Sequence, residues 1–402
     1  MFAAALGRLA ALPRRPGRFL LAPALAGGRW LVGSGTPTLV GGTEAGLGIL
    51  PRLLEPGPRG TVVVIGYELG RSLVGGGRAA EDLGLPRAVA IRVEEAVALD
   101  PVTGAVEVDL PVAPPPRLPD RVASGVAFSL DRPAHRAAVE RIHEAIRAGE
   151  TYQANLTVRL EARWPHPPEA LFAALHARGT QACSAFVDLP GGAAVASASP
   201  ESLLHYDAAT RTARSLPIKG TRRRGADEAE DRALAAELAA DPKERAEHVM
   251  IVDLVRNDLG RVAAVGGVRV PALFRVDRLP GVHHLVSEVE ARLAPDRTLA
   301  DLVASLFPAG SITGAPKLRT MEIIDELEPV ARGPYCGAIG LVRPDGSCDL
   351  SVAIRTAVLR DGGAWYGAGG GITIDADADR EWEELLLKAR PFLSAVGALP
   401  AC

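Results

Sequence analysis

The sequence predicts a mixed α+β fold. Short β-branched runs such as residues 61–65 and 151–158 indicate strands. Apolar residues recur at helical spacing in other stretches, for example after residue 131. The two patterns alternate along the chain without forming the repeated strand–helix–strand units of a doubly wound sheet. We therefore expect an α+β rather than an α/β architecture.

The composition is that of a globular chain with an ample core. Of the 402 residues, 48% are hydrophobic and 23% are charged, and the formal net charge is −3. This balance gives no basic footprint for nucleic acid or for an acidic membrane surface. No apolar run approaches the ~18 residues that a membrane span needs. The four cysteines show no C-x-x-C spacing, which favours a cytoplasmic location over a disulfide framework or a zinc site.

A proline-rich connector over residues 113–119 is the best boundary in the sequence. It separates a β-rich N-terminal region, residues 1–120, from a second region, residues 121–398. The two need not fold independently, and we expect the first to pack into the same core. The first 43 residues contain arginines and no acid, but prolines break their apolar runs. We interpret them as strands and turns rather than as a targeting segment.

Caps and spacing predict the order of elements in the second region. A helix opens at the N-cap Asp131 and ends at Gly149, and a strand follows at 151–158. The other expected elements are strands leading to residue 219, helices at 227–240 and from 241, a loop at 307–317 before an amphipathic helix, three strands, a glycine cluster at 367–371 and a final helix from about 379.

Pro217-Ile218-Lys219-Gly220-Thr221 is the stretch around which we expect the chemistry to be organised. It follows an expected strand, and its Gly-Thr pair predicts a turn. Proline fixes the entry of the chain and glycine lets the backbone approach a ligand, so Lys219 would be held in place. By itself, the pentapeptide favours a surface turn with a solvated lysine. A chemical role depends on other segments that supply a metal, an acid and an anion cradle.

Two expected helices carry paired glutamates. Glu244 and Glu247 are three residues apart and share a helix face, and so do Glu381 and Glu384. Because Mg²⁺ is commonly held by a few carboxylates together with waters and a substrate oxygen, each pair is a candidate magnesium site. In isolation, two solvated helix faces explain the pairs better. Apolar stripes after both pairs indicate that the helices are docked.

Three further features could serve an anionic substrate. The glycine cluster at 367–371 could offer backbone N–H groups to a carboxylate, although read alone it predicts only a tight turn. Arg355 lies in an apolar stretch that predicts a strand, where an unpaired arginine is rare, so an anionic partner or ligand is expected. His283 and His284 are adjacent and would point to opposite sides of a strand, with one of them structural.

These segments closely resemble the chorismate-utilising enzymes over about residues 120–396. The resemblance rests on ordered motifs, which are Tyr152-Gln153-Ala154-Asn155-Leu156-Thr157, Ser199-Pro200-Glu201, the pentapeptide at 217–221, the run 246–259, Val282-His283-His284-Leu285-Val286-Ser287, the run 307–317, and the glycine cluster with Glu381-Trp382-Glu383-Glu384. It implies an anthranilate synthase component I-like fold, with antiparallel β-sheets packed as a sandwich core flanked by helices. Residues 121–398 would be the chorismate-binding catalytic domain.

The resemblance also implies a cofactor and a substrate site. The cofactor would be Mg²⁺, bound by Glu247 and Glu384 with Glu381 close by. The implied substrate-binding positions are Arg355, Tyr335, Gly369, Gly371 and Thr313.

Within the family, the pentapeptide resembles the aminodeoxychorismate synthase, or para-aminobenzoate, branch. Enzymes that make anthranilate typically have a small residue in place of Lys219. Isochorismate and salicylate synthases need a lysine base where this chain has Gln153, and glutamine cannot activate water. The branch implies that Lys219 is a covalent nucleophile, that Glu201 is the general acid and that His284 lies near the ring. The product would be 4-amino-4-deoxychorismate, for folate synthesis. Arg223, where the family usually has proline, departs from the pattern.

The chain has no glutaminase cysteine motif, so the resemblance implies that ammonia comes from a separate glutamine amidotransferase subunit. Two alternatives stay open. One is anthranilate synthase component I, which retains a pyruvate-eliminating step. The other is a non-catalytic chorismate-family binding subunit.

Overall fold

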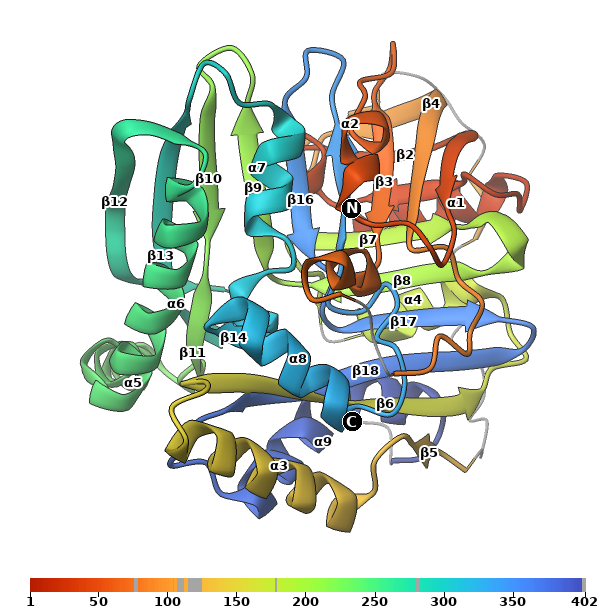
Figure 1. Ribbon diagram of the computed structural model, residues 1–402. Helices are drawn as coiled ribbons and strands as arrows, with labels where there is room; N and C mark the ends of the chain where they lie inside the picture. Colours follow the sequence, from red (N-terminus) through yellow and green to blue (C-terminus); the bar gives the residue numbers. More distant parts are fainter. Residues whose placement is uncertain are drawn as a thin grey trace.

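The computed structural model describes residues 1–75, 79–103, 105–106, 112–114, 125–177, 179–279 and 282–399. Most of the predicted connector at 113–119 lies outside the described residues, so the boundary near residue 120 stays a prediction. The described strands form one continuous sheet of eighteen strands, and helices pack against it (Figure 1).

The strands are β1 (Phe19–Leu21), β2 (Trp30–Gly41), β3 (Thr61–Ile65), β4 (Ala88–Leu99), β5 (Ala127–Phe128), β6 (Gln153–Arg163), β7 (Cys183–Asp188), β8 (Ala194–Ser199), β9 (Ser202–Asp207), β10 (Thr212–Leu216), β11 (Ile218–Arg223), β12 (Ala263–Arg278), β13 (Val282–Leu293), β14 (Gly314–Ala315), β15 (Ala338–Val342), β16 (Cys348–Val352), β17 (Thr356–Arg360) and β18 (Gly363–Ile372). The α-helices are α1 (Phe2–Ala11), α2 (Leu50–Leu53), α3 (Arg132–Arg147), α4 (Pro168–Leu175), α5 (Glu228–Ala240), α6 (Pro242–Gly260), α7 (Leu299–Leu306), α8 (Lys317–Leu327) and α9 (Ala378–Ala395).

The sheet has two antiparallel arms that share β4. One arm runs from β4 through β2, β1, β7, β8, β17 and β18 to β6. The other runs from β4 through β3, β15, β16, β9 and β10 to β13, which also pairs with β11 and β12. β4 can join the arms because its 12 residues pair with β2 on one edge and with β3 on the other.

The two arms pack face to face. Val62 and Ile339 of one arm share a buried cluster with Phe19, Ala185 and Val195 of the other. Helices α1, α4 and α9 cover the outer face of the first arm, and α2, α6 and α7 cover that of the second. Burying both faces of each arm in this way gives the layered core of a sandwich. The prediction of an α+β sandwich flanked by helices is confirmed.

The N-terminal region contributes to both arms. β1 pairs with β7, and β3 pairs with β15. The chain begins with helix α1, whose Leu6 and Leu9 are buried against the first arm. The expectation of only strands and turns in this region was wrong, because these spaced apolar residues dock a helix.

The predicted caps of helix α3 are confirmed. Asp131 accepts a hydrogen bond from the backbone N–H of Ala134 at 2.9 Å, and Gly149 just after the helix has φ +76°. In the described part of the chain, no helix is long and apolar enough to cross a membrane.

Candidate functional site

Residues from both arms line a cavity of about 180 Å³, here called the central cavity. Six of the site residues predicted from the sequence line it, namely Glu201, Lys219, Tyr335, Arg355, Gly369 and Gly371. The lining also includes Gln153, Asn155, Ser311, Tyr366 and Lys388.

Lys219 lies in strand β11 and not in a turn. The pairing register of β11 with β13 shifts between Ile218 and Thr221. This shift is a β-bulge, and Gly220 within it has φ +87°, a conformation that other residues rarely adopt. The predicted turn was therefore wrong, although the glycine does mark a local irregularity. Bulges commonly re-aim a side chain, and this one lies beside the lysine that lines the cavity.

The Lys219 ammonium forms an ion pair with Glu247 of helix α6. Nζ of Lys219 lies 2.8 Å from Oε2 of Glu247, and Nζ of Lys243 lies 3.8 Å from Oε1. Lys243 is largely exposed and Glu247 is mostly buried, so Lys219 is the closer and better shielded partner.

Helix α9 repeats this pairing. Glu384 lies 2.8 Å from Nζ of Lys388, which also donates to the backbone carbonyl of Gly369 at 2.9 Å. The Lys388 charge, more than any other effect, lowers the pKa of Glu384. Burial, and then repulsion by Glu384, raises the pKa of the neighbouring Glu381 carboxyl.

The chemistry of these three carboxylates fits Mg²⁺, which prefers oxygen ligands. The Lys219 and Lys243 charges act on both Glu381 and Glu384, so helices α6 and α9 bring their acids within electrostatic range of one another. Within the described residues, however, no three His, Cys, Asp or Glu side chains gather closely enough to hold a metal ion. Lysines hold Glu247 and Glu384 instead. The magnesium site stays a prediction.

Glu201 lies between β8 and β9 and is only 7% exposed. The Ser311 hydroxyl donates a hydrogen bond to its Oε1 at 2.8 Å. Burial raises the pKa of Glu201 to about 7, against the opposing effects of this hydrogen bond and of the Lys219 charge. A carboxyl with such a pKa is protonated to a large extent near neutral pH, as a general acid must be.

Arg355 lies in the connection between β16 and β17 and not in a strand, so that expectation was wrong. Its φ of +50° is unusual for a residue other than glycine. Among the described residues, no acidic side chain forms an ion pair with its guanidinium. A cation that lines a cavity without a counter-ion is suited to an anionic ligand.

The glycine cluster at 367–371 forms part of strand β18 and not a turn. β18 pairs with β6 along its whole length. A Cβ at Gly369 would lie 2.2 Å from the carbonyl oxygen of Leu156, and one at Gly367 would lie 2.1 Å from the ring of Tyr335. Glycine is therefore needed for close packing of the two strands and of Tyr335 against them.

The other predicted site residues are not part of the cavity lining; they are Thr313, His284, Glu247, Glu381 and Glu384. The Thr313 hydroxyl donates to a backbone carbonyl of its own loop at 2.9 Å. His284 shares a hydrogen bond of 2.9 Å with the Thr221 hydroxyl, whereas His283 bonds Asp231 at 2.8 Å. The different partners of the adjacent histidines agree with the predicted alternation along a strand.

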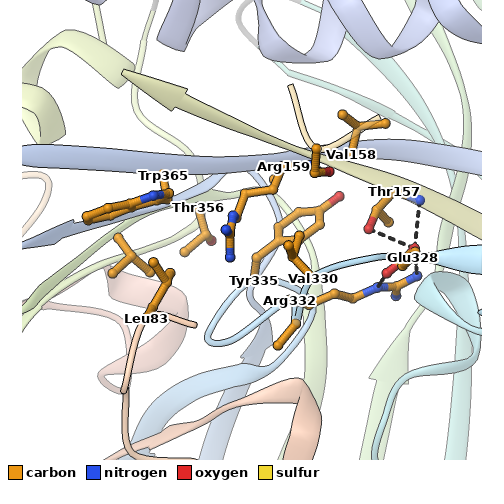
Figure 2. A pocket seen from close by; sticks show the side chains of 14 residues that line it. Leu83, Thr157, Val158, Arg159, Glu328, Val330, Arg332, Tyr335, Thr356 and Trp365 are labelled. Carbon is orange, nitrogen blue, oxygen red and sulfur yellow. Dashed lines mark hydrogen bonds and ion pairs between the residues drawn. The ribbon is translucent and has the colours of Figure 1, made fainter. Parts of the chain in front are cut away.

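A second, small cavity of about 20 Å³ shares Tyr335 with the central cavity (Figure 2). In its wall, the buried Glu328 and Arg332 form an ion pair of 2.7 Å. Arg332 also donates to the backbone carbonyls of Ile312 and Asn155, at 2.7 Å each. Because Ile312 and Asn155 line the central cavity, this ion pair holds two segments of its wall together.

Sequence reasoning gave no positive role to three residues of the lining. Gln153 is buried, and its Oε1 has no hydrogen-bond partner in the described residues. Lys388 follows Glu384 by four residues, a spacing from which the ion pair could have been predicted. Ser311 lies in the motif 307–317, where nothing in the sequence indicated its contact with Glu201.

The chain matches the family described as chorismate binding enzyme over residues 50–394. Anthranilate synthase component 1 of Thermus thermophilus is 46% identical over 286 residues, which cover 70% of this chain and 61% of that protein. Aminodeoxychorismate synthase of Streptomyces pristinaespiralis is 45% identical over 274 residues, which cover 68% of this chain and 38% of that protein. The matched part of this chain thus spans less than two thirds of either relative.

A solved structure gives the same result for the fold. The crystal structure of anthranilate synthase component I from Streptococcus pneumoniae TIGR4 superposes with a TM-score of 0.77 at 26% identity. The superposition covers 96% of this chain and 93% of the other.

Proposed function

Since this chain belongs to the chorismate binding enzyme family, we propose that it aminates chorismate to 4-amino-4-deoxychorismate, the precursor of para-aminobenzoate and folate. The observation that carries the proposal is that one cavity contains both the amine of Lys219 and the acid of Glu201, whose pKa is about 7. A relative that is 45% identical is named aminodeoxychorismate synthase, which supports the same activity.

The reaction needs an acid because the ring hydroxyl of chorismate is a poor leaving group. Glu201 gives its proton to that hydroxyl, which leaves as water. The neutral amine of Lys219 forms the new bond to the ring and loses a proton. Ammonia then displaces the lysine, which regains a proton and is free for the next turnover. Atoms and charges balance, since one ammonia enters and one water leaves.

Lys219 must be uncharged to attack, whereas in the structure its Nζ lies 2.8 Å from Oε2 of Glu247. Mg²⁺ bound by Glu247 and Glu384, with Glu381 nearby, would neutralise a substrate carboxylate and stabilise the charge that develops in the ring. Glu247 would then serve both as a ligand of the cation and as the partner of Lys219.

The substrate is a dianion, and the remaining wall of the central cavity suits it. Arg355 presents a guanidinium with no acidic partner among the described residues. Tyr335 packs directly against Gly367 of β18, where a side chain would collide with its ring, and both residues line the cavity. We assign Arg355, Tyr335, Gly369 and Gly371 to substrate binding.

Ammonia would come from a separate glutamine amidotransferase subunit. A glutaminase needs a reactive thiolate, and the cysteines that the structure describes are buried. Burial raises the pKa of Cys183 and that of Cys336 to about 12 each, which keeps both thiols protonated.

Identification of the product tests the proposal. The purified protein is incubated with chorismate, Mg²⁺ and ammonium at alkaline pH, and the products are identified by mass spectrometry. We expect 4-amino-4-deoxychorismate with its enolpyruvyl side chain intact. Absence of any turnover would refute the proposal. Glutamine in place of ammonium should give almost no product from this chain alone.

Anthranilate synthase component I is the second candidate, since a protein of that name is 46% identical to this chain. It would release anthranilate and pyruvate in the same assay. Lys219 argues for amination without elimination, because a covalent nucleophile in the cavity is of no use to direct attack by ammonia.

A further inference from the structure

A third, small cavity of about 10 Å³, which is room for about one water, adjoins the central cavity at Glu201. Glu201, Ile251 and Ser311 line both cavities, so the Glu201 carboxyl lies in the wall between them. We call this third cavity the rear chamber. Its other polar residues are Ser202, Ser215 and Asp258, which make it a suitable place for an ordered water.

Glu201 must regain a proton in every turnover. Its carboxyl is nearly inaccessible to solvent even without a ligand. A substrate in the central cavity would exclude bulk water from that side. The rear chamber gives the carboxyl a second, polar side, and the Ser311 hydroxyl already donates a hydrogen bond to it there at 2.8 Å.

We propose that Glu201 regains its proton from the rear chamber, through the hydroxyl of Ser311, with the Asp258–Lys317 pair as the outer proton source. This inference rests on the proposed function. In the relay, Ser311 passes its proton to Oε1 of Glu201 and takes one from a water in the chamber. That water is replenished by Asp258 and Lys317. Ammonia loses a proton when it forms its bond to the ring, and that proton goes to solvent. The number of protons taken up by Glu201 therefore equals the number released.

The Asp258–Lys317 pair is suited to exchange a proton. Nζ of Lys317 donates to Oδ2 of Asp258 at 2.7 Å and to a backbone carbonyl at 3.1 Å. Both side chains are largely buried. Burial raises the pKa of Asp258 and lowers that of Lys317, which brings the charged and the neutral forms of the pair closer in energy. The Lys317 side chain is 10% exposed, so the outer end of the pair reaches solvent.

The other charged or titratable groups near Glu201 come from several elements and would stay in place if Ser311 were changed. They are Lys219 from β11, Arg355 from the connection after β16, Asp258 from α6 and Cys183 from β7. A change in the titration of Glu201 in a Ser311 variant therefore reports the lost hydroxyl.

The test compares Ser311→Ala with Ser311→Thr, which keeps the hydroxyl. We expect kcat for amination to fall by about 10- to 100-fold in Ser311→Ala with little change in KM for chorismate. The limb of the pH profile that requires protonated Glu201 should move to higher pH, because a donor to the carboxylate form is lost. The solvent deuterium isotope effect on kcat should rise, since proton delivery becomes limiting. Ser311→Thr should restore all three.

Infrared titration of the protonated-carboxyl band separates this inference from the proposed function. The band that disappears in Glu201→Gln is assigned to the Glu201 carboxyl. We expect Ser311→Ala to move its titration to higher pH even if the protein makes a different product. An unmoved band, or a moved band with a wild-type kcat and isotope effect, would overturn the relay.

A second variant tests whether Asp258 and Lys317 supply the proton at the outer end of the relay. Asp258→Asn combined with Lys317→Met removes both charges together, so that neither is left buried without a partner. It should raise the solvent isotope effect as Ser311→Ala does. An unchanged isotope effect in a folded double variant would exclude Asp258 and Lys317 as the source.

Discussion

The glutamates in and beside the central cavity have two contrasting surroundings. On the side of helices α6 and α9, Glu247 and Glu384 each lie 2.8 Å from a lysine ammonium. In the wall next to the rear chamber, Glu201 is buried and its Oε1 accepts a hydrogen bond from a hydroxyl rather than an ion pair. The Lys388 charge lowers the pKa of Glu384, whereas burial raises that of Glu201 to about 7.

The difference shows that surroundings, rather than residue type, divide the roles. A carboxylate that is kept ionised can ligate a cation or hold a lysine, whereas one with a pKa of about 7 can donate a proton. Variants that alter one of the two surroundings at a time separate these roles.

Replacing Lys219 by alanine should have the largest effect. Loss of the nucleophile should lower the rate of 4-amino-4-deoxychorismate formation by about 10⁴-fold or more. The rate is measured with ammonium as the nitrogen source. The matched control is Lys243→Ala, which removes the exposed, more distant partner of Glu247 and should leave most of the activity. Full activity in Lys219→Ala would refute the covalent role.

Changing Glu247 to glutamine tests the glutamates of helices α6 and α9 that pair with lysines. The variant should lose about 10³-fold in rate and should need much more Mg²⁺, because a neutral amide is a poorer ligand. A magnesium titration of activity measures the change. Glu244→Gln, on the same face of α6, serves as the comparison. A titration of Glu247→Gln that matches the wild type would exclude Glu247 as a metal ligand.

Changing Glu201 to glutamine tests the buried side through stability. The folded protein keeps the Glu201 proton until the pH approaches 7, whereas the unfolded chain loses it near 4.5. Ionisable Glu201 therefore lowers stability progressively as the pH rises between these values. Glu201→Gln should be stabilised relative to the wild type by roughly 3 kcal/mol at pH 8 and by much less at pH 4. Equal differences in unfolding free energy at both pH values would contradict the raised pKa.

The smallest expected effect is a loss of stability from a change in strand β18, whose glycines line the central cavity. Gly369→Ala should lower the free energy of unfolding by about 1–3 kcal/mol, because its Cβ meets a backbone carbonyl that cannot move away. Gly370→Ala is the matched control. Its Cβ would lie 3.2 Å from the end of the Glu381 side chain, which can rotate away. Chemical denaturation should rank the two variants, and equal losses would argue against close packing of β18 on β6.

Much of the fold could be predicted from the sequence because caps and periodicity are local signals. Asp131 and Asp241 begin helices as expected, and both accept hydrogen bonds from the first-turn N–H groups. The stretches around Lys219 and Gly369 were predicted as turns because glycine is frequent in turns. In the structure they are strands, since pairing with β13 and β6 outweighs the local preference.

Individual site residues could be predicted from the sequence where a motif marks them. Contacts between site residues that are far apart in the chain could not. Glu201 and Lys219 could be named from motifs, and the structure places both in one cavity. The contact of Ser311 with Glu201 joins residues 110 positions apart in the chain. Such a contact has no local signature, because the packing of separate elements creates it.

Mass spectrometry of the intact protein and its peptides is the most direct test of Lys219 as the nucleophile. The protein is incubated with chorismate and Mg²⁺ without ammonium and is then quenched and digested. We predict a covalent adduct equal to chorismate less one water, carried by the peptide that contains Lys219 and absent from Lys219→Ala. An adduct-free wild-type protein that still aminates chorismate once ammonium is added would contradict the covalent mechanism.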